Sequence, residues 1–345
     1  MSSRLKSSIK FIVFLAVGVL LMYFAFRKID LGRMLTDLKE ANYSWVGVSL
    51  ALSVIALASR SYRWGMLIEP LHKRPKFSNL FHAVNVGYFA NLAFPRLGEI
   101  TRCTALYEVE ETSIDSLVGT VIAERVIDVI CLLILIVLTV LTNVKLIGGF
   151  FLNMFKDKLE FITHMSPVVS AILILIVAAG IFFIYLFRSR IMALPLAGKV
   201  MKFMTGIIAG LKSVSKLKNR KAFIFHTVVI WLCYYLSSYV AFFSIPETSH
   251  LGLSAGLFIL VVGSIGMSAP VQGGFGAFHF MVASGLVLYG IVPHIDPVTG
   301  KEISKGLLFA TIVHSSQTLL ILVFGCISLI MLNIEKRKQL KHAKA

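Results

Sequence analysis

The chain has 345 residues, of which 57% are hydrophobic and 15% are charged, and its formal net charge is +17 at pH 7. Soluble domains carry about 25% charged residues, so this composition excludes an ordinary soluble enzyme and predicts an integral membrane protein. The basic residues lie in short segments between apolar runs, a pattern that orients membrane spans and attracts anionic lipid head groups rather than nucleic acid. The four cysteines are scattered, with no CxxC and no Cys/His cluster, so the sequence supports neither a disulfide framework nor a metal site.

Six apolar runs predict full membrane spans, at about residues 8–26, 44–68, 117–141, 166–187, 222–245 and 306–332. No small-residue cleavage site follows the first run, so we expect a retained span and not a removed signal peptide. Residues 27–42 predict an amphipathic connector at the lipid interface. Near the end of the second span, Arg60, Arg63 and Trp64 are interpreted as anchors that reach the interface.

A broken apolar stretch follows at residues 77–115. It is apolar as far as Phe94, then reads Pro95-Arg96-Leu97-Gly98-Glu99, and its returning limb is too polar to cross lipid. An ionisable residue at membrane depth is costly and is by default a functional-site hypothesis. Arg96 and Glu99 are three residues apart and could pair on a helix. The alternative interpretation is an ordinary polar loop between two spans.

A second broken stretch covers residues 251–291 and is split at Pro-Val-Gln-Gly-Gly-Phe-Gly, residues 270–276. Its three glycines, Gly273, Gly274 and Gly276, could expose backbone N–H groups to a phosphate, or could simply allow tight helix packing. Gln272 supplies a neutral donor within the break. Three residues after the last glycine lies His279, which is either a hydrogen-bonded core residue or part of a site, and the same two interpretations hold for His314 in the last span.

Charge decides the expected topology. Residues 188–221 contain nine Lys or Arg and no acid, and predict a basic amphipathic segment on the cytoplasmic surface. The N-terminus and the basic tail at 333–345 are then also cytoplasmic, provided that the first broken stretch enters and leaves on the cytoplasmic side. We therefore predict one all-α, polytopic domain over residues 1–345, with about six full spans and two broken or re-entrant hairpins entering from opposite faces. Opposed broken helices can build a binding site at the membrane midplane.

The third span carries charged residues that could line such a site. Glu124 and Asp128 are four residues apart on one helix face, and Arg125 is three residues from Asp128. They could satisfy one another, or could pair with Arg96 or Arg102 from the first hairpin. Such a network could orient helices only, or could also bind a substrate. No nucleophile–base pair, P-loop or zinc spacing is present in the sequence, so we expect no cofactor and no direct use of ATP.

Four motifs, in this order, resemble the flippase-like membrane domain of lysylphosphatidylglycerol synthases over nearly the whole chain. They are Arg60-Ser61-Tyr62-Arg63-Trp64, Pro95-Arg96-Leu97-Gly98-Glu99, Glu124-Arg125-Val126-Ile127-Asp128 and Pro270-Val271-Gln272-Gly273-Gly274-Phe275-Gly276. In those synthases this domain moves an aminoacylated lipid to the outer leaflet, while a separate cytosolic domain makes the lipid. The resemblance implies a stand-alone member that lacks the synthase domain. Family members commonly carry an acid at the position of His279 and an Arg near that of His314.

The resemblance implies a multi-pass protein of the cell inner membrane that translocates a lipid with a charged or phosphate-bearing head group, and is not an enzyme. Arg96 and Arg102 would hold an anionic head group, and Glu99 would pair with them or with a cationic one. The substrate-binding set that we predict is Arg96, Glu99, Arg102, Glu124, Arg125, Asp128, Gln272, Gly273, Gly274, Gly276 and His279. Two alternatives stay open: an intramembrane enzyme that uses Glu99, Glu124 or Asp128 as a base on a lipid-linked substrate, and a non-transporting scaffold for lipid-synthesis enzymes.

Overall fold

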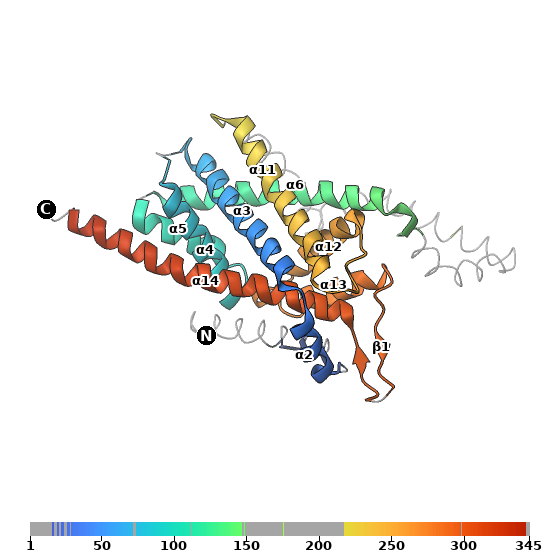
Figure 1. Cartoon of the computed structure of the whole chain (residues 1–345). Coiled ribbons are helices and arrows are strands. Elements are labelled where there is room, and N and C mark those ends of the chain that lie inside the picture. The colour runs from blue at the N-terminus through green and yellow to red at the C-terminus, as the bar shows by residue number, and fades with distance from the viewer. Residues whose placement is uncertain are drawn as a thin grey trace.

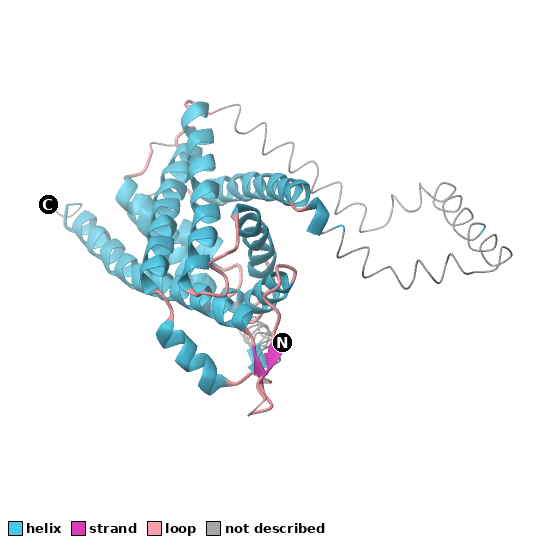
Figure 2. Cartoon of the chain, turned by 45° about the vertical axis from the view of Figure 1, so that its right-hand side comes forward, coloured by secondary structure: helices cyan, strands magenta, loops and turns pink. Residues whose placement is uncertain are grey.

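The computed structural model describes residues 29–71, 74–110, 112–146, 217–297 and 299–342, with isolated residues between 16 and 27 and at 148 and 175. This part of the chain is almost entirely helical, with one small β-hairpin (Figures 1 and 2). The predicted all-α fold is therefore confirmed. The predicted spans at 8–26 and 166–187, and most of the basic segment at 188–221, lie outside the described residues.

Among the described residues, three helices are long and apolar enough to cross a membrane. They are α3 (Tyr43–Ile68), α11 (Arg220–Val240) with its continuation η1 (Ala241–Ser244), and α14 (Lys305–His342). A fourth helix, α6 (Ile114–Thr142), coincides with the predicted third span and carries Glu124 and Asp128. These helices confirm a polytopic membrane protein. The basic residues after 333 continue α14 as far as His342.

Helices α3 and α11 lie side by side and run in opposite directions (Figure 1). The hydroxyl oxygens of Ser49 and Ser237 are 2.7 Å apart, and further along the pair Arg63 Nη1 donates to Thr227 Oγ1 at 3.3 Å. Residue numbers thus rise along α3 as they fall along α11. Small hydroxyl residues in the seam let the two backbones approach closely. We call the end of the molecule where α3 ends and α11 begins the first end, and the opposite one the second end.

The first hairpin consists of α4 (Phe77–Ala93) and α5 (Gly98–Glu110). Pro95 ends α4 because the residue before a proline is driven out of the helical region, and Phe94 is extended at φ −133°. The two helices pack closely because a Cβ at Gly87 would lie only 2.8 Å from the carbonyl oxygen of Gly98. The hairpin begins and ends at the first end, where Lys76 and Glu108 pair with the end of α14.

The second hairpin consists of α12 (Leu253–Met267), η2 (Gln272–Gly274) and α13 (Ala277–Val287). It follows η1 directly and so begins at the second end. Three glycines let the chain turn at the tip: Gly273, Gly274 and Gly276 have φ values of 54°, 76° and 77°, which residues with a Cβ rarely adopt. A Cβ at Gly273 would lie 3.0 Å from Cδ2 of Leu92 in α4. The two hairpins therefore enter from opposite ends, as predicted, and their tips meet inside the protein.

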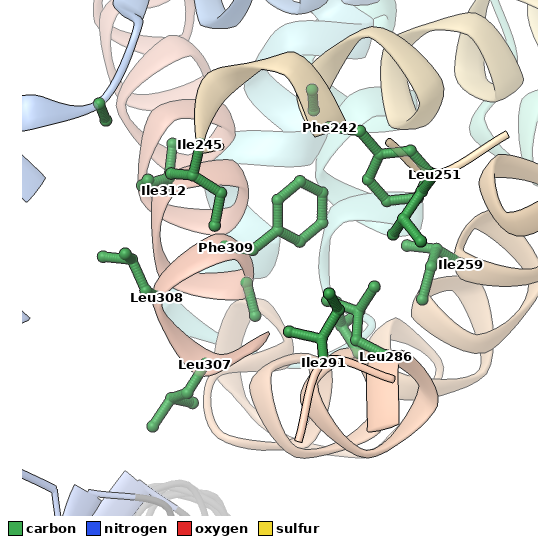
Figure 3. Close-up of a cluster of buried hydrophobic side chains, with 14 of the residues drawn as sticks. Phe242, Ile245, Leu251, Ile259, Leu286, Ile291, Leu307, Leu308, Phe309 and Ile312 are labelled. Atoms are coloured by element: carbon green, nitrogen blue, oxygen red, sulfur yellow. The ribbon is translucent and has the colours of Figure 1, made fainter. Parts of the chain in front are cut away.

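A hydrophobic core holds the second end together (Figure 3). Its side chains come from η1, α12, α13 and α14, and include Phe242, Ile259, Leu286 and Phe309. Helix α2 (Leu31–Glu40) packs against this core through Met34 and Leu38, and β1 (His294–Ile295) pairs with β2 (Glu302–Ile303). Asp37 of α2 is buried and pairs with Lys305 at 3.0 Å, so the predicted interfacial connector is a helix clamped to the start of α14.

Candidate functional site

A buried ionic cluster joins α3, α5 and α6 near the middle of the bundle. It consists of Arg60, Arg63, Arg102, Glu124 and Asp128, all of them buried. Arg60 donates to Glu124 and to Asp128 at 2.8 Å each, and Arg63 contacts the same two carboxylates at 3.2 and 2.6 Å. Arg102 donates to the other oxygen of Glu124 at 2.7 Å. The predicted pairing of the first hairpin with the acids of the third span is thus confirmed for Arg102.

The interpretation of Arg60, Arg63 and Trp64 as interface anchors is wrong. The side chains of Arg60 and Arg63 are 4% and 0% exposed, because each spans the two acids of α6. Trp64 is fully buried, donates to Thr120 at 2.9 Å and lies under the guanidinium of Arg102 at 4.7 Å. All three side chains point into the protein, where the carboxylates of Glu124 and Asp128 neutralise the charges of the two arginines.

A looser ion pair lies beside the cluster. Arg125 contacts Glu99 at 3.4 Å and Asp128 at 3.9 Å, and its side chain is 41% exposed. It therefore lies at the edge of the cluster, which it reaches through Asp128, although it neighbours Glu124 in the sequence. The oxygen Oε2 of Glu99 is buried and has no hydrogen-bond partner in the described part of the chain. Glu99 thus pairs with α6 and not with Arg96.

Arg96 lies in the turn of the first hairpin. Because α5 begins only at Gly98, Arg96 is outside the helix and cannot take the three-residue spacing toward Glu99 that we predicted. Its φ is +63°, unusual for a residue with a Cβ, and its side chain is exposed. Backbone strain of this kind concentrates at functional sites.

A cavity of about 590 Å³ opens where the two hairpin tips approach α3, α11 and α14. We call it the central cavity. Its charged residues are Arg60, Arg96, Glu99 and Arg125, and the remaining lining is apolar or uncharged polar. Leu57, Ile259, Leu260, Val313 and Leu320 are among the apolar residues. The cavity is therefore a mostly apolar space with one charged wall.

The tip of the second hairpin forms another wall of the central cavity, with Gly273 and Gly274 in the lining. The Nε2–H of His314 donates to the carbonyl oxygen of Gly273 at 2.8 Å, which ties the tip to α14. The ring of His314 lines the cavity and packs against His279, with 4.9 Å between ring centroids. Gln272 and His279 are buried behind this wall. The N–H of Gly274 donates to the carbonyl oxygen of Val271 within the turn and so is not free for a ligand.

The structure thus divides the predicted site residues into two groups. Five line the central cavity: Arg96, Glu99, Arg125, Gly273 and Gly274. Arg102, Glu124 and Asp128 stand behind it in the ionic cluster, while Gln272, Gly276 and His279 support the second tip.

Comparison with known families agrees with this architecture. The model of the family described as lysylphosphatidylglycerol synthase TM region matches residues 11–325. The chain belongs to this family. No curated protein and no solved structure matches it. The resemblance inferred from the four motifs is confirmed, and the match covers all residues of the ionic cluster and all described residues that line the central cavity.

In this member of the lysylphosphatidylglycerol synthase TM family, sequence reasoning missed several residues of the site. Arg60 lines the central cavity, together with Tyr88 of α4 and Tyr234 of α11. Arg60 and Arg63 are three residues apart, and the acids of α6 are four apart. This complementary spacing on two apolar helices was the signal that could have revealed the pairing.

Proposed function

We propose that the protein moves a polar lipid across the membrane by admitting its head group to the central cavity. The observation that carries the proposal is the position of the charged wall, Arg60, Arg96, Glu99 and Arg125, beside apolar surface at the meeting point of two opposed hairpins. A head group is costly to transfer through hydrocarbon because its charges lose water. A charged wall at this depth offers replacement partners, while the apolar lining suits the acyl chains.

We further propose that the first end faces the cytoplasm of the cell inner membrane. Described basic residues at this end include Arg74, Lys76, Lys218, Arg220 and Lys336. Fewer described basic residues lie at the second end, where they include Arg33, Lys39, Lys301 and Lys305. The positive-inside rule favours this orientation, and the basic residues would contact anionic lipids of the inner leaflet.

The lipid is expected to leave the protein chemically unchanged, as a transported substrate and not as the reactant of an enzyme. The carboxylates of the ionic cluster support this proposal, because each is held by two or three arginines. Carboxylate oxygens occupied by guanidinium groups in this way are not free to take a proton from a substrate. Mass spectrometry of lipids incubated with the purified protein tests this point, since a covalent change would shift the mass.

The experiment for transport compares three proteins reconstituted into vesicles that contain a fluorescent phospholipid. The wild type is set against Ser264→Phe, which places a ring in the central cavity, and Ile265→Phe, which places the same ring on the exposed neighbouring face of α12. Fluorophore that becomes accessible to an external quencher reports transbilayer movement. We expect movement with the wild type and Ile265→Phe, and only the protein-free background with Ser264→Phe. Equal rates for all three proteins would remove the central cavity from the transport path.

A further inference from the structure

We infer that the central cavity selects a lipid with a net anionic head group, which Arg125 and Arg96 bind. This inference rests on the proposed function and names its substrate class. It follows from three observations on the described residues: the charge balance around the cavity, the pairing of each arginine, and the polarity of the lining.

The charge balance leaves positive charge unpaired. Five arginines, Arg60, Arg63, Arg96, Arg102 and Arg125, lie in the ionic cluster or on the charged wall. They face three carboxylates: Glu99, Glu124 and Asp128. The described part of the site therefore carries two more positive than negative charges. Because unpaired charge inside a protein is costly, this excess favours an anion and disfavours a cationic head group.

The pairing of each arginine shows where the anion would bind. Arg60 also lines the cavity, but both of its terminal nitrogens donate to carboxylates at 2.8 Å. Among the described residues Arg125 has two longer contacts, to Glu99 and Asp128, and its side chain lines the cavity and is 41% exposed. Arg96 is exposed at the rim in the turn of the first hairpin. An arginine guanidinium can bind two phosphate oxygens through two parallel hydrogen bonds. Arg125 is therefore the residue that we expect to bind a phosphodiester.

The lining indicates a lipid rather than a soluble phosphate ester. Leucine, isoleucine, valine and phenylalanine side chains from α3, α12 and α14 continue directly from the charged wall. A soluble anion would leave this apolar surface without a partner, whereas acyl chains would cover it. Glu99 can remain paired with Arg125 when a singly charged phosphodiester binds, because each terminal nitrogen of Arg125 carries two N–H donors and contacts one carboxylate.

The test measures transport selectivity in the reconstituted vesicles. Three lipids carry the same fluorescent acyl chain and differ in the head group: phosphatidylglycerol (anionic), phosphatidylcholine (zwitterionic) and a trimethylammonium propane lipid (cationic). The wild type is compared with Arg125→Gln, with Arg96→Gln and with Arg337→Gln, a control that removes an exposed charge near the end of α14. Size-exclusion profiles in detergent verify that each variant is folded.

We expect the wild type and Arg337→Gln to move phosphatidylglycerol faster than the other two lipids. A hydrogen bond to a charged group contributes about 1.5–3 kcal/mol, so Arg125→Gln should reduce this preference about tenfold or more. Arg96→Gln should reduce it in the same direction. Preference for the cationic or the zwitterionic lipid in the wild type, or an unchanged preference in both Arg125→Gln and Arg96→Gln, would overturn the inference.

The outcome for the substrate class is separable from that for transport. If all three lipids move equally and Ser264→Phe still blocks them, transport stands and anionic selection fails. If no lipid moves above background, the proposed function itself fails. Adding millimolar glycerol phosphate outside the vesicles distinguishes the two sources of a phosphate ester. Unchanged phosphatidylglycerol transport supports a lipid ligand, and strong inhibition would show that a soluble ester binds instead.

Discussion

Arg102 of α5 and Glu124 of α6 are joined by a 2.7 Å hydrogen bond between buried atoms. The bond fixes the returning limb of the first hairpin to a helix that also holds both arginines of α3. Through Glu124, therefore, α3, α5 and α6 share one ionic cluster, and that cluster forms the back of the charged wall of the central cavity. A change at this carboxylate should affect three helices at once.

Replacing Glu124 with Gln should strongly destabilise the protein. The variant leaves Arg60, Arg63 and Arg102 with Asp128 as their only acid in the cluster, and breaking a buried ion pair on one side costs about 3–5 kcal/mol. Thermal unfolding in detergent micelles measures the change. The matched control is Glu108→Gln, since Glu108 makes an exposed pair with Lys336 that contributes at most about 1 kcal/mol. Similar melting temperatures for the two variants would contradict the role assigned to the cluster.

Replacing Gly274 with Ala should destabilise the tip of the second hairpin. Its φ is +76°, which costs a residue with a Cβ about 1–2 kcal/mol, and the new methyl group would collide with Sδ of Met267. We expect a lower melting temperature and slower lipid movement. Gly252→Ala is the control, because nothing lies within 4 Å of its Cβ position and its φ is −86°. An equal effect of both substitutions would argue against a strained tip.

Cysteines at positions 49 and 237 should form a disulfide under mild oxidation. The two serine oxygens are 2.7 Å apart, so the Cβ atoms are close enough for a bond. The pair is introduced after the four native cysteines have been replaced, and a shift in gel mobility after proteolysis between the helices reports the cross-link. Cysteines at 59 and 237 are the control, because ten residues along α3 move the site by about 15 Å. Cross-linking of the control pair alone would contradict the antiparallel register that places the hairpins at opposite ends.

Acid should weaken the contact between Glu247 and Lys305 at the second end. Burial acts to raise the pKa of Glu247, but the hydrogen bond from Lys305 and the charge of Lys305 lower it below its usual 4.5. A carboxyl group whose pKa is lower in the folded than in the unfolded protein stabilises the folded state at pH values above the unfolded pKa. This stabilisation is lost as the pH falls through the pKa of the folded protein. The wild type should therefore melt above Glu247→Gln at pH 6, and the difference should shrink toward about pH 3. A difference that grows on acidification would contradict this contact.

Much of the fold could be predicted from local signals. Pro95 and the glycines after Pro270 marked the two breaks, because each interrupts an apolar run with residues that end helices or need positive φ. The balance of basic residues predicted opposite entry for the hairpins, and the antiparallel packing of α3 and α11 confirms it.

The site was harder to predict because its partners are distant in sequence. Arg60 lies 64 positions from Glu124, and its place near the end of an apolar run fits a side chain that reaches the lipid interface as well as one that points into the protein. Arg125, which follows Glu124 in the sequence, was expected within the buried network. Because α6 turns adjacent side chains to different faces, Arg125 lines the cavity instead and pairs with Glu99. The cavity itself depends on helix spacing, which a single sequence does not specify.

The most direct test of the central claim is mass spectrometry of the lipids that co-purify with the protein. The wild type, Ser264→Phe and Ile265→Phe are extracted and purified identically, and the bound lipids are compared with the bulk membrane. If the central cavity holds a lipid, one phosphate-bearing species is enriched in the wild type and in Ile265→Phe and is depleted in Ser264→Phe. Bulk lipid composition in all three preparations would contradict the account.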